Sequence, residues 1–163
     1  MDEDRELAFE RAVAGETGRL FGLALAIVGD RAEAEDAVQE TLLSAWRRWT
    51  SLRDPAKRSA WLTRICVNHS IHRRRLRRRL TLWSRDRWAA TAGSQKIDLN
   101  GRLADIHRAF RTLSPSQRAV VTLHLHHGFT VDECAELAGC RPGTARSHLG
   151  RAVAKLRKEL LDA

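Results

Sequence analysis

The sequence lacks several features that would restrict its class. Its three cysteines are too few and too scattered for a disulfide scaffold. No stretch approaches the roughly 18 consecutive apolar residues of a membrane-spanning helix, so we expect no membrane insertion. The acidic first residues, MDEDRE, lack the basic start of a secretory signal. These absences together predict a cytoplasmic protein.

The motifs of common enzymes and metal sites are also missing. There is no Walker loop, no H-E-x-x-H and no G-x-S-x-G, so no residue set has a spacing suited to catalysis. Three histidines within residues 124–127 lie near Cys134, but adjacent and alternating helical histidines point in divergent directions. No second pair of cysteines completes four ligands. We therefore expect no enzymatic activity, no bound metal and no cofactor.

What the chain does contain is apolar residues and strongly segregated charge. With 163 residues, of which 43% are hydrophobic, it can bury the core of one ordinary domain or of two small ones. The net charge of +9 favours a polyanionic partner, either nucleic acid or an anionic membrane surface. Residues 1–40 carry 4 basic and 11 acidic side chains, whereas residues 51–90 carry 12 basic and 2 acidic ones. The two parts are therefore expected to face different partners.

The clearest pattern is a helix-turn-helix within residues 113–161. Thr130 and Glu133 have the T-x-x-E spacing of a capping box, which marks a helix start. Gly139 permits the sharp turn that ends this helix, and Pro142 suits the first turn of the next. The apolar stripe of that last helix consists of Ala145, Leu149, Ala152, Val153, Leu156 and Leu160.

The opposite face of the last helix carries small, polar and basic groups and no acid. A DNA major groove admits a helix whose first turns contact base edges while arginine and lysine reach phosphates. The face therefore favours DNA recognition, although a solvated basic face on an ordinary helical bundle has a similar composition.

Further helices are expected in the first half of the chain. The apolar-periodic residues 7–28 end at Gly29, and Asp30 then caps a helix over residues 31–49. On one face of this helix a leucine stands among charged and polar groups. This face consists of Asp36, Gln39, Glu40, Leu43 and Arg47. Such a face is typical of a protein contact, but single exposed leucines without a function are also common.

A third helix begins at about Ala60 and ends in HRRRLRRRL, with six arginines between Arg73 and Arg79. Adjacent like charges repel one another unless a polyanion relieves them, so this run predicts a nucleic-acid contact. Residues 84–101 are small and polar and predict a flexible linker. The expected fold is all-α, with two small helical domains, residues 1–83 and 102–163, and the helix-turn-helix in the second.

Three segments together resemble the extracytoplasmic-function group of bacterial RNA polymerase sigma factors, which keep only sigma regions 2 and 4. GDRAEAEDAVQETLLSAWRRW resembles the region 2 helix that docks on the polymerase clamp, and AWLTRICVNHSIHRRRLRRR resembles the adjoining promoter-melting helix. LSPSQRAVVTLHLHHGFTVDECAELAGCRPGTARSHLGRAVAKLRKEL resembles region 4. His72, Arg141 and Ala145 depart from the usual family pattern without disturbing the hydrophobic register.

The resemblance implies a sigma factor that binds core RNA polymerase and directs promoter recognition, promoter melting and transcription initiation. Polymerase contacts are implied at Asp36, Gln39, Glu40, Leu43 and Arg47. Contacts to the downstream promoter element and the melted strand are implied at Trp61, Arg64, Asn68, Arg73, Arg74 and Arg75, with residues 50–59 lining a base pocket. Contacts to the upstream promoter element are implied at Arg141, Thr144, Arg146, Ser147, His148 and Arg151. An anti-sigma factor is a further candidate partner.

Two other functions fit parts of the sequence. A dimeric regulator would bind a palindrome through the C-terminal helix-turn-helix, and an RNA-binding protein would use the arginine run. A dimeric regulator needs a dimerisation surface, and it has no use for an acidic docking helix beside a melting helix. The sequence therefore favours the sigma factor.

Overall fold

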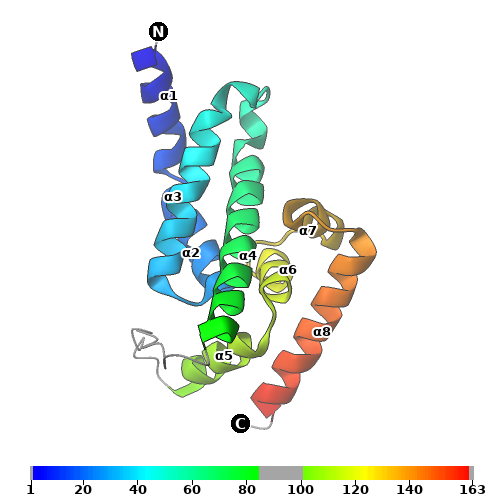
Figure 1. Ribbon diagram of the computed structural model, residues 1–163. Coiled ribbons are helices and arrows are strands. Elements are labelled where there is room, and N and C mark those ends of the chain that lie inside the picture. Colours follow the sequence, from blue (N-terminus) through cyan, green and yellow to red (C-terminus); the bar gives the residue numbers. More distant parts are fainter. Residues whose placement is uncertain (1, 85–100, 162–163) are drawn as a thin grey trace.

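The computed structural model describes residues 2–84 and 101–161, and every regular element in these ranges is helical (Figure 1). The first range contains α1 (Asp2–Ala14), α2 (Thr17–Val28), α3 (Arg31–Arg47), the 3-10 turns η1 (Trp49–Ser51) and η2 (Pro55–Lys57), and α4 (Arg58–Ser84). The second contains α5 (Gly101–Thr112), α6 (Pro115–Leu125), α7 (Val131–Ala138) and α8 (Pro142–Leu161). The predicted all-α class is confirmed. The predicted linker lies outside the described residues, except for Ser84 and Gly101, which end α4 and begin α5.

Local capping chemistry sets the helix ends where the sequence predicts them. Gly29 ends α2 in the left-handed conformation, with φ at 74°. The carboxylate of Asp30 accepts the backbone N–H of Glu33 at 3.0 Å and so caps α3. The capping box of α7 is present in both directions, because Thr130 and Glu133 each accept the other's backbone N–H.

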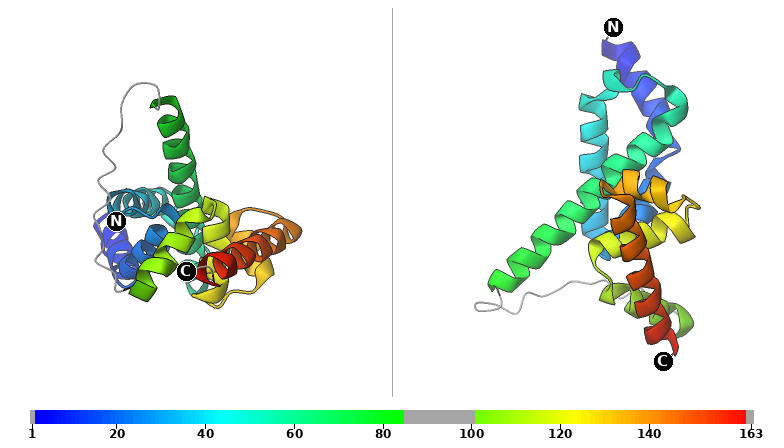
Figure 2. Two further views of the ribbon diagram at one scale, coloured as in Figure 1. Left: turned by 90° about the horizontal axis from the view of Figure 1, so that it is seen from below. Right: turned by 90° about the vertical axis from the view of Figure 1, so that its right-hand side faces the viewer.

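The 27-residue helix α4 lies at the centre of the molecule. Helices α2 and α3 pack along one side of it, and α6 and α7 pack along another (Figure 1). Two further views show that the last turns of α4 project beyond the other helices (Figure 2). Since α6 and α7 follow the predicted linker in sequence, α4 joins the two helical units in space.

The two helical units share one hydrophobic core. Leu20 and Ile27 of α2, Leu62 of α4, and Val120 and Leu123 of α6 are all fully buried in the same cluster. Burying a side chain of this size contributes about 1.5–3 kcal/mol. The sequence predicts two units joined by a flexible linker. It does not predict that their apolar side chains pack in one core, as they do in the structure.

A buried arginine lies at the junction between the units. Arg118 of α6 is 2% exposed, and its Nη1 donates to the carbonyl of Ile27 at 3.2 Å while its Nη2 donates to the carbonyl of Arg111 at 3.1 Å. These carbonyls belong to the last turns of α2 and α5, where helical carbonyls lack partners and the helix dipole is negative. A Cβ at Gly29 would lie 2.9 Å from Arg118 Nη1, so the C-cap of α2 lies close against the guanidinium.

We predict that Arg118→Met lowers the free energy of unfolding by roughly 1–3 kcal/mol, because it keeps the aliphatic packing but leaves one buried and one partly buried carbonyl without donors. Unfolding in urea, followed by circular dichroism, measures the change. Arg111→Met is the matched control: its side chain is exposed, only its carbonyl is used, and an effect within about 0.5 kcal/mol is expected.

Tryptophan fluorescence tests whether the units unfold together, because all five tryptophans precede residue 101. In Arg118→Met, the fluorescence midpoint is expected to fall together with the circular dichroism midpoint. A fluorescence midpoint that stays at the wild-type value would show that the first unit does not depend on the second.

Candidate functional site

The predicted polymerase-docking face lies on α3. The opposite side of the helix is anchored by Ala34, Ala37 and Ala45, which are fully buried. This burial turns a polar face toward solvent, and Leu43 stands on it with 56% of its surface exposed. Asp36, Gln39 and Arg47 are exposed and Glu40 is half-buried. The structure therefore brings the five predicted residues together on one accessible surface around a leucine.

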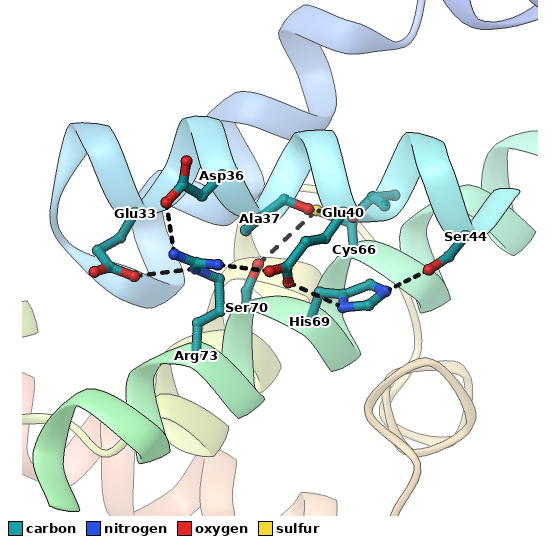
Figure 3. A network of polar contacts seen from close by, with 10 residues as sticks. Glu33, Asp36, Ala37, Glu40, Ser44, Cys66, His69, Ser70 and Arg73 are labelled. Carbon is teal, nitrogen blue, oxygen red and sulfur yellow. Dashed lines mark hydrogen bonds and ion pairs between the residues drawn. The ribbon is translucent and has the colours of Figure 1, made fainter. Parts of the chain in front are cut away.

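Arg73 of α4 lies against the acidic edge of this face (Figure 3). Its Nε donates to Glu33 at 3.0 Å. Its Nη1 and Nη2 donate to Glu40 and Asp36, each at 2.6 Å. The Arg73 side chain is only 22% exposed. Although the sequence assigns Arg73 to the melted strand, the structure places its guanidinium among three carboxylates of α3.

Other residues extend this polar seam between α3 and α4. His69 Nδ1 lies 3.3 Å from Glu40 Oε2, and its Nε2 lies 2.9 Å from the hydroxyl of Ser44 (Figure 3). Arg77 Nη1 lies 3.4 Å from a carboxylate oxygen of Asp30. His69, Arg73 and Arg77 recur at intervals of four residues, so one stripe of α4 faces α3.

Four of the six residues predicted to contact the melted strand occupy a different stripe of α4. Trp61, Arg64, Asn68 and Arg75 fall within roughly 60° of one another around the helix, at 100° per residue. Trp61 is half-buried against the core, whereas Arg64, Asn68 and Arg75 are exposed. The stripe thus combines one anchored aromatic ring with accessible cationic and amide groups.

This second stripe borders the helix-turn-helix unit. Arg75 Nη2 donates to the hydroxyl of Ser116, at the start of α6, at 3.2 Å. A Cβ at Gly139, in the turn between α7 and α8, would lie 3.7 Å from Asn68 Oδ1. Arg74, the remaining predicted contact, is half-buried. The predicted strand-holding face and the predicted duplex-reading unit are therefore neighbours.

The loop predicted to form a base pocket has a cavity beside it. The loop is shaped by η1 and η2, and Asp54 caps η2 by accepting the backbone N–H of Ala56 at 3.0 Å. The cavity, of about 460 Å³, lies between this loop and α1, and its lining comprises Arg5, Ala8, Ala12, Trp49, Thr50, Leu52, Pro55 and Arg58. The Nε atoms of Arg5 and Arg58 have no hydrogen-bond partner. The cavity thus combines an apolar lining with two guanidinium groups.

The helix-turn-helix presents the predicted upstream readers on the outside. Gly139, with φ at 64°, makes the turn between α7 and α8. Ala145 and Ala152 are fully buried, which fixes the rotation of α8. The predicted readers Arg141, Thr144, Arg146, Ser147 and Arg151 are exposed, and His148 is half-buried. Arg146 lies 3.2 Å from Asp132, but both side chains are more than 60% exposed, so this ion pair is weak.

Two histidines of this unit have lowered pKa values. Burial, followed by the positive charges of Arg151 and Arg75, lowers the pKa of His148. Burial and the neighbouring His126 lower the pKa of His127. Neither His148 Nδ1 nor His127 Nε2 has a hydrogen-bond partner. Both rings are therefore neutral at pH 7, and His148 offers a ring that can donate or accept a hydrogen bond.

Within residues 2–84 and 101–161, no group of three or more His, Cys, Asp and Glu side chains is placed to hold a metal ion. Burial raises the pKa of the Cys134 thiol to about 11, so this sulfur is protonated at neutral pH and is a poor ligand. In the same ranges, no helix is long and apolar enough to cross a membrane.

Sequence reasoning missed two residues that the structure adds to these surfaces, Arg5 and His69, whereas Arg58 belongs to the loop predicted to line the base pocket. His69 precedes Arg73 by one helical turn, so its spacing was a usable signal. Arg5 lies in an acidic segment far from the loop in sequence, and only tertiary packing brings it to the cavity.

Comparison with known families matches both helical units. The Sigma-70 region 2 family matches residues 14–80, and the family described as Sigma-70, region 4 matches residues 103–156. The ECF RNA polymerase sigma factor SigL of Mycobacterium tuberculosis is 36% identical over 162 residues, which cover 96% of this chain and 92% of that protein. The RNA polymerase sigma-E factor of Streptomyces coelicolor is 29% identical, covering 95% of this chain and 87% of that protein.

Solved structures show the same similarity. The sigma factor RpoE of Bartonella quintana, in complex with the anti-sigma factor NepR, superposes with a TM-score of 0.72 and 28% identity. That match covers 94% of this chain and 96% of the other. CnrH, in complex with the cytosolic domain of CnrY, gives a TM-score of 0.65 and 27% identity over 96% of this chain and 89% of the other.

The lowered pKa values of His127 and His148 predict a pH-dependent stability. Because the unfolded chain binds a proton at each site more readily than the folded chain, the free energy of unfolding should decrease as the pH falls through about 6.5. Replacing both with glutamine should flatten this dependence between pH 7.5 and 5.5, measured by urea unfolding. A wild-type stability that is constant or increases over this interval would contradict the prediction.

Proposed function

This chain belongs to the ECF group of RNA polymerase sigma factors, and we propose that separate surfaces of it bind polymerase, the melted strand and the upstream duplex. As a sigma factor it directs promoter recognition and transcription initiation, in a family not known for enzymes. We assign residues 1–83 to the region 2 unit, 84–101 to a linker and 102–163 to the region 4 unit. Its partners, polymerase and chromosomal DNA, place its action in the cytoplasm.

The polymerase-docking surface is the exposed face of α3. The observation that supports it best is Leu43, which is 56% exposed and stands among Asp36, Gln39, Glu40 and Arg47. A leucine surrounded by polar groups is suited to fill an apolar pocket while the surrounding charges select the partner. In this proposal the partner is the clamp of the largest polymerase subunit.

The downstream surface is the outward stripe of α4 together with the loop before it. Trp61 supplies a ring for an unstacked base, Arg64 and Arg75 supply phosphate contacts, and Asn68 supplies a base-edge hydrogen bond, with Arg74 at the margin. Stacking on an aromatic ring contributes about 1–3 kcal/mol per base and tolerates any base, so polar neighbours must provide specificity. The cavity beside η1 and η2 has the mixed apolar and cationic lining that an extruded nucleotide requires.

The upstream surface is the exposed face of α8. Arg141 immediately precedes this helix, its first turns carry Thr144, Arg146, Ser147 and His148, and Arg151 follows one turn later. The N-terminal turns of a recognition helix contact base edges, whereas cationic groups further along reach phosphates. The neutral ring of His148 is suited to contact a base edge as donor or acceptor.

An anti-sigma factor is the remaining proposed partner. Two solved relatives with the same overall arrangement are complexes, of RpoE with the anti-sigma factor NepR and of CnrH with the cytosolic domain of CnrY. The match covers 94% and 96% of this chain in the two cases, so both helical units resemble sigma factors that bind such a partner.

The docking assignment predicts that Leu43→Asp weakens binding to core polymerase roughly five- to thirtyfold, because it removes about 1–2 kcal/mol of apolar burial at the contact. Fluorescence titration of labelled protein with core polymerase measures the dissociation constant. Helicity is expected to be unchanged, since Leu43 is exposed.

Glu35→Lys is the matched control, because Glu35 is an exposed α3 acid about a quarter-turn away from the docking face. It should leave the affinity within about twofold. Equal affinities for wild type and Leu43→Asp would show that the exposed face of α3 is not the docking surface.

A further inference from the structure

The six arginines after His72 do not form one charged surface. Arg73 and Arg77 face the carboxylates of α3, while Arg75 and Arg79 are exposed. Around α4, Arg73 points about 150° away from the mean direction of the stripe that carries Arg64 and Arg75. The helical period therefore divides the run into cations used within the protein and cations open to DNA.

We propose that Arg73 is a positioning residue for the polymerase-docking face of α3 and does not contact promoter DNA. This role rests on the docking surface proposed above. Arg73 would affect polymerase binding without contacting polymerase itself. Two observations support this role: the three ion pairs that Arg73 makes with α3 (Figure 3), and the direction in which Arg73 points from α4.

The geometry lets Arg73 hold the carboxylates without covering them. Its own side chain is 22% exposed, whereas those of Asp36 and Glu40 are 54% and 41% exposed. Arg73 donates to Asp36 Oδ2 and to Glu40 Oε1, and Asp36 Oδ1 accepts neither of these hydrogen bonds. A planar guanidinium that binds several carboxylates at once fixes their rotamers, so a partner cation meets groups that are already ordered.

The charge balance is compatible with docking. Glu33, Asp36 and Glu40 bring three negative charges against the single positive charge of Arg73, so the cluster keeps a net charge of −2 when His69 is neutral. The face therefore still attracts a basic partner. Arg73 reduces the repulsion among the three carboxylates, which otherwise would push the acidic side chains apart.

The test compares two arginines of the same helix. Arg73→Ala should weaken binding to core polymerase on the order of tenfold, because two interfacial carboxylates lose their ordering. In holoenzyme assembled at saturating protein, it should leave the salt dependence of promoter binding unchanged. Arg75→Ala is the matched variant: core affinity should be unchanged, and the logarithmic salt slope of promoter binding should fall by about one.

A double-mutant cycle separates positioning from general destabilisation. If Arg73 acts through Asp36 and Glu40, then Arg73→Ala should have little further effect on core affinity in an Asp36→Ala, Glu40→Ala background. Arg73→Lys should recover part of the affinity, because an ammonium keeps the charge but not the planar fork. Arg73→Lys also serves as the test variant if Arg73→Ala is too unstable to fold. Thermal unfolding measures the stability of both variants.

Two results would overturn the proposal: a core affinity of Arg73→Ala within twofold of wild type, or a salt slope lowered as in Arg75→Ala. Additive effects of Arg73→Ala and of the combined Asp36→Ala, Glu40→Ala change would also overturn it. The docking surface itself is judged separately by Leu43→Asp. If Leu43→Asp weakens core binding and Arg73→Ala does not, only the positioning role fails.

Discussion

The guanidinium of Arg118 joins the C-terminal ends of two helices that are far apart in sequence. It donates to carbonyls in the last turns of α2 and α5, and the core around it contains side chains of α2, α4 and α6. A buried cation is tolerated here because it meets the negative ends of two helix dipoles and otherwise unpaired carbonyls. Since α7 and α8 pack against α6, the position of α8 relative to α4 depends on this junction.

Helix α4 then distributes three kinds of contact around its circumference. Its apolar side enters the shared core, its His69–Arg73–Arg77 stripe meets the acids of α3, and its Trp61–Arg75 stripe remains outside. The segregation of charge along the sequence, acidic before residue 40 and basic after residue 51, is thereby partly neutralised inside the first unit. This also explains how a dense arginine run is accommodated without nucleic acid, although its remaining cations favour a polyanion.

Features governed by neighbouring residues could be predicted from the sequence. The caps at Asp30 and Thr130, the turns at Gly29 and Gly139 and the exposed face around Leu43 follow from short-range chemistry and helical periodicity, and the structure agrees. The contact of Arg118 with Ile27 spans 91 residues, and no local pattern indicates it. The same limit applies to Arg73: the run and its period were visible, but which arginines meet carboxylates depends on how α4 is packed against α3. The cavity near η1 likewise required the placement of Arg5 from α1.

Site-specific photocrosslinking can show whether three surfaces of this sigma factor contact three different partners. A photoreactive amino acid would replace Leu43, Asn68 or Ser147 in turn, in holoenzyme bound to promoter DNA. We expect crosslinks from position 43 to the largest polymerase subunit, from position 68 to the melted non-template strand, and from position 147 to the upstream duplex. Crosslinks from position 43 to DNA, or from position 68 to polymerase alone, would show that these surfaces are wrongly assigned.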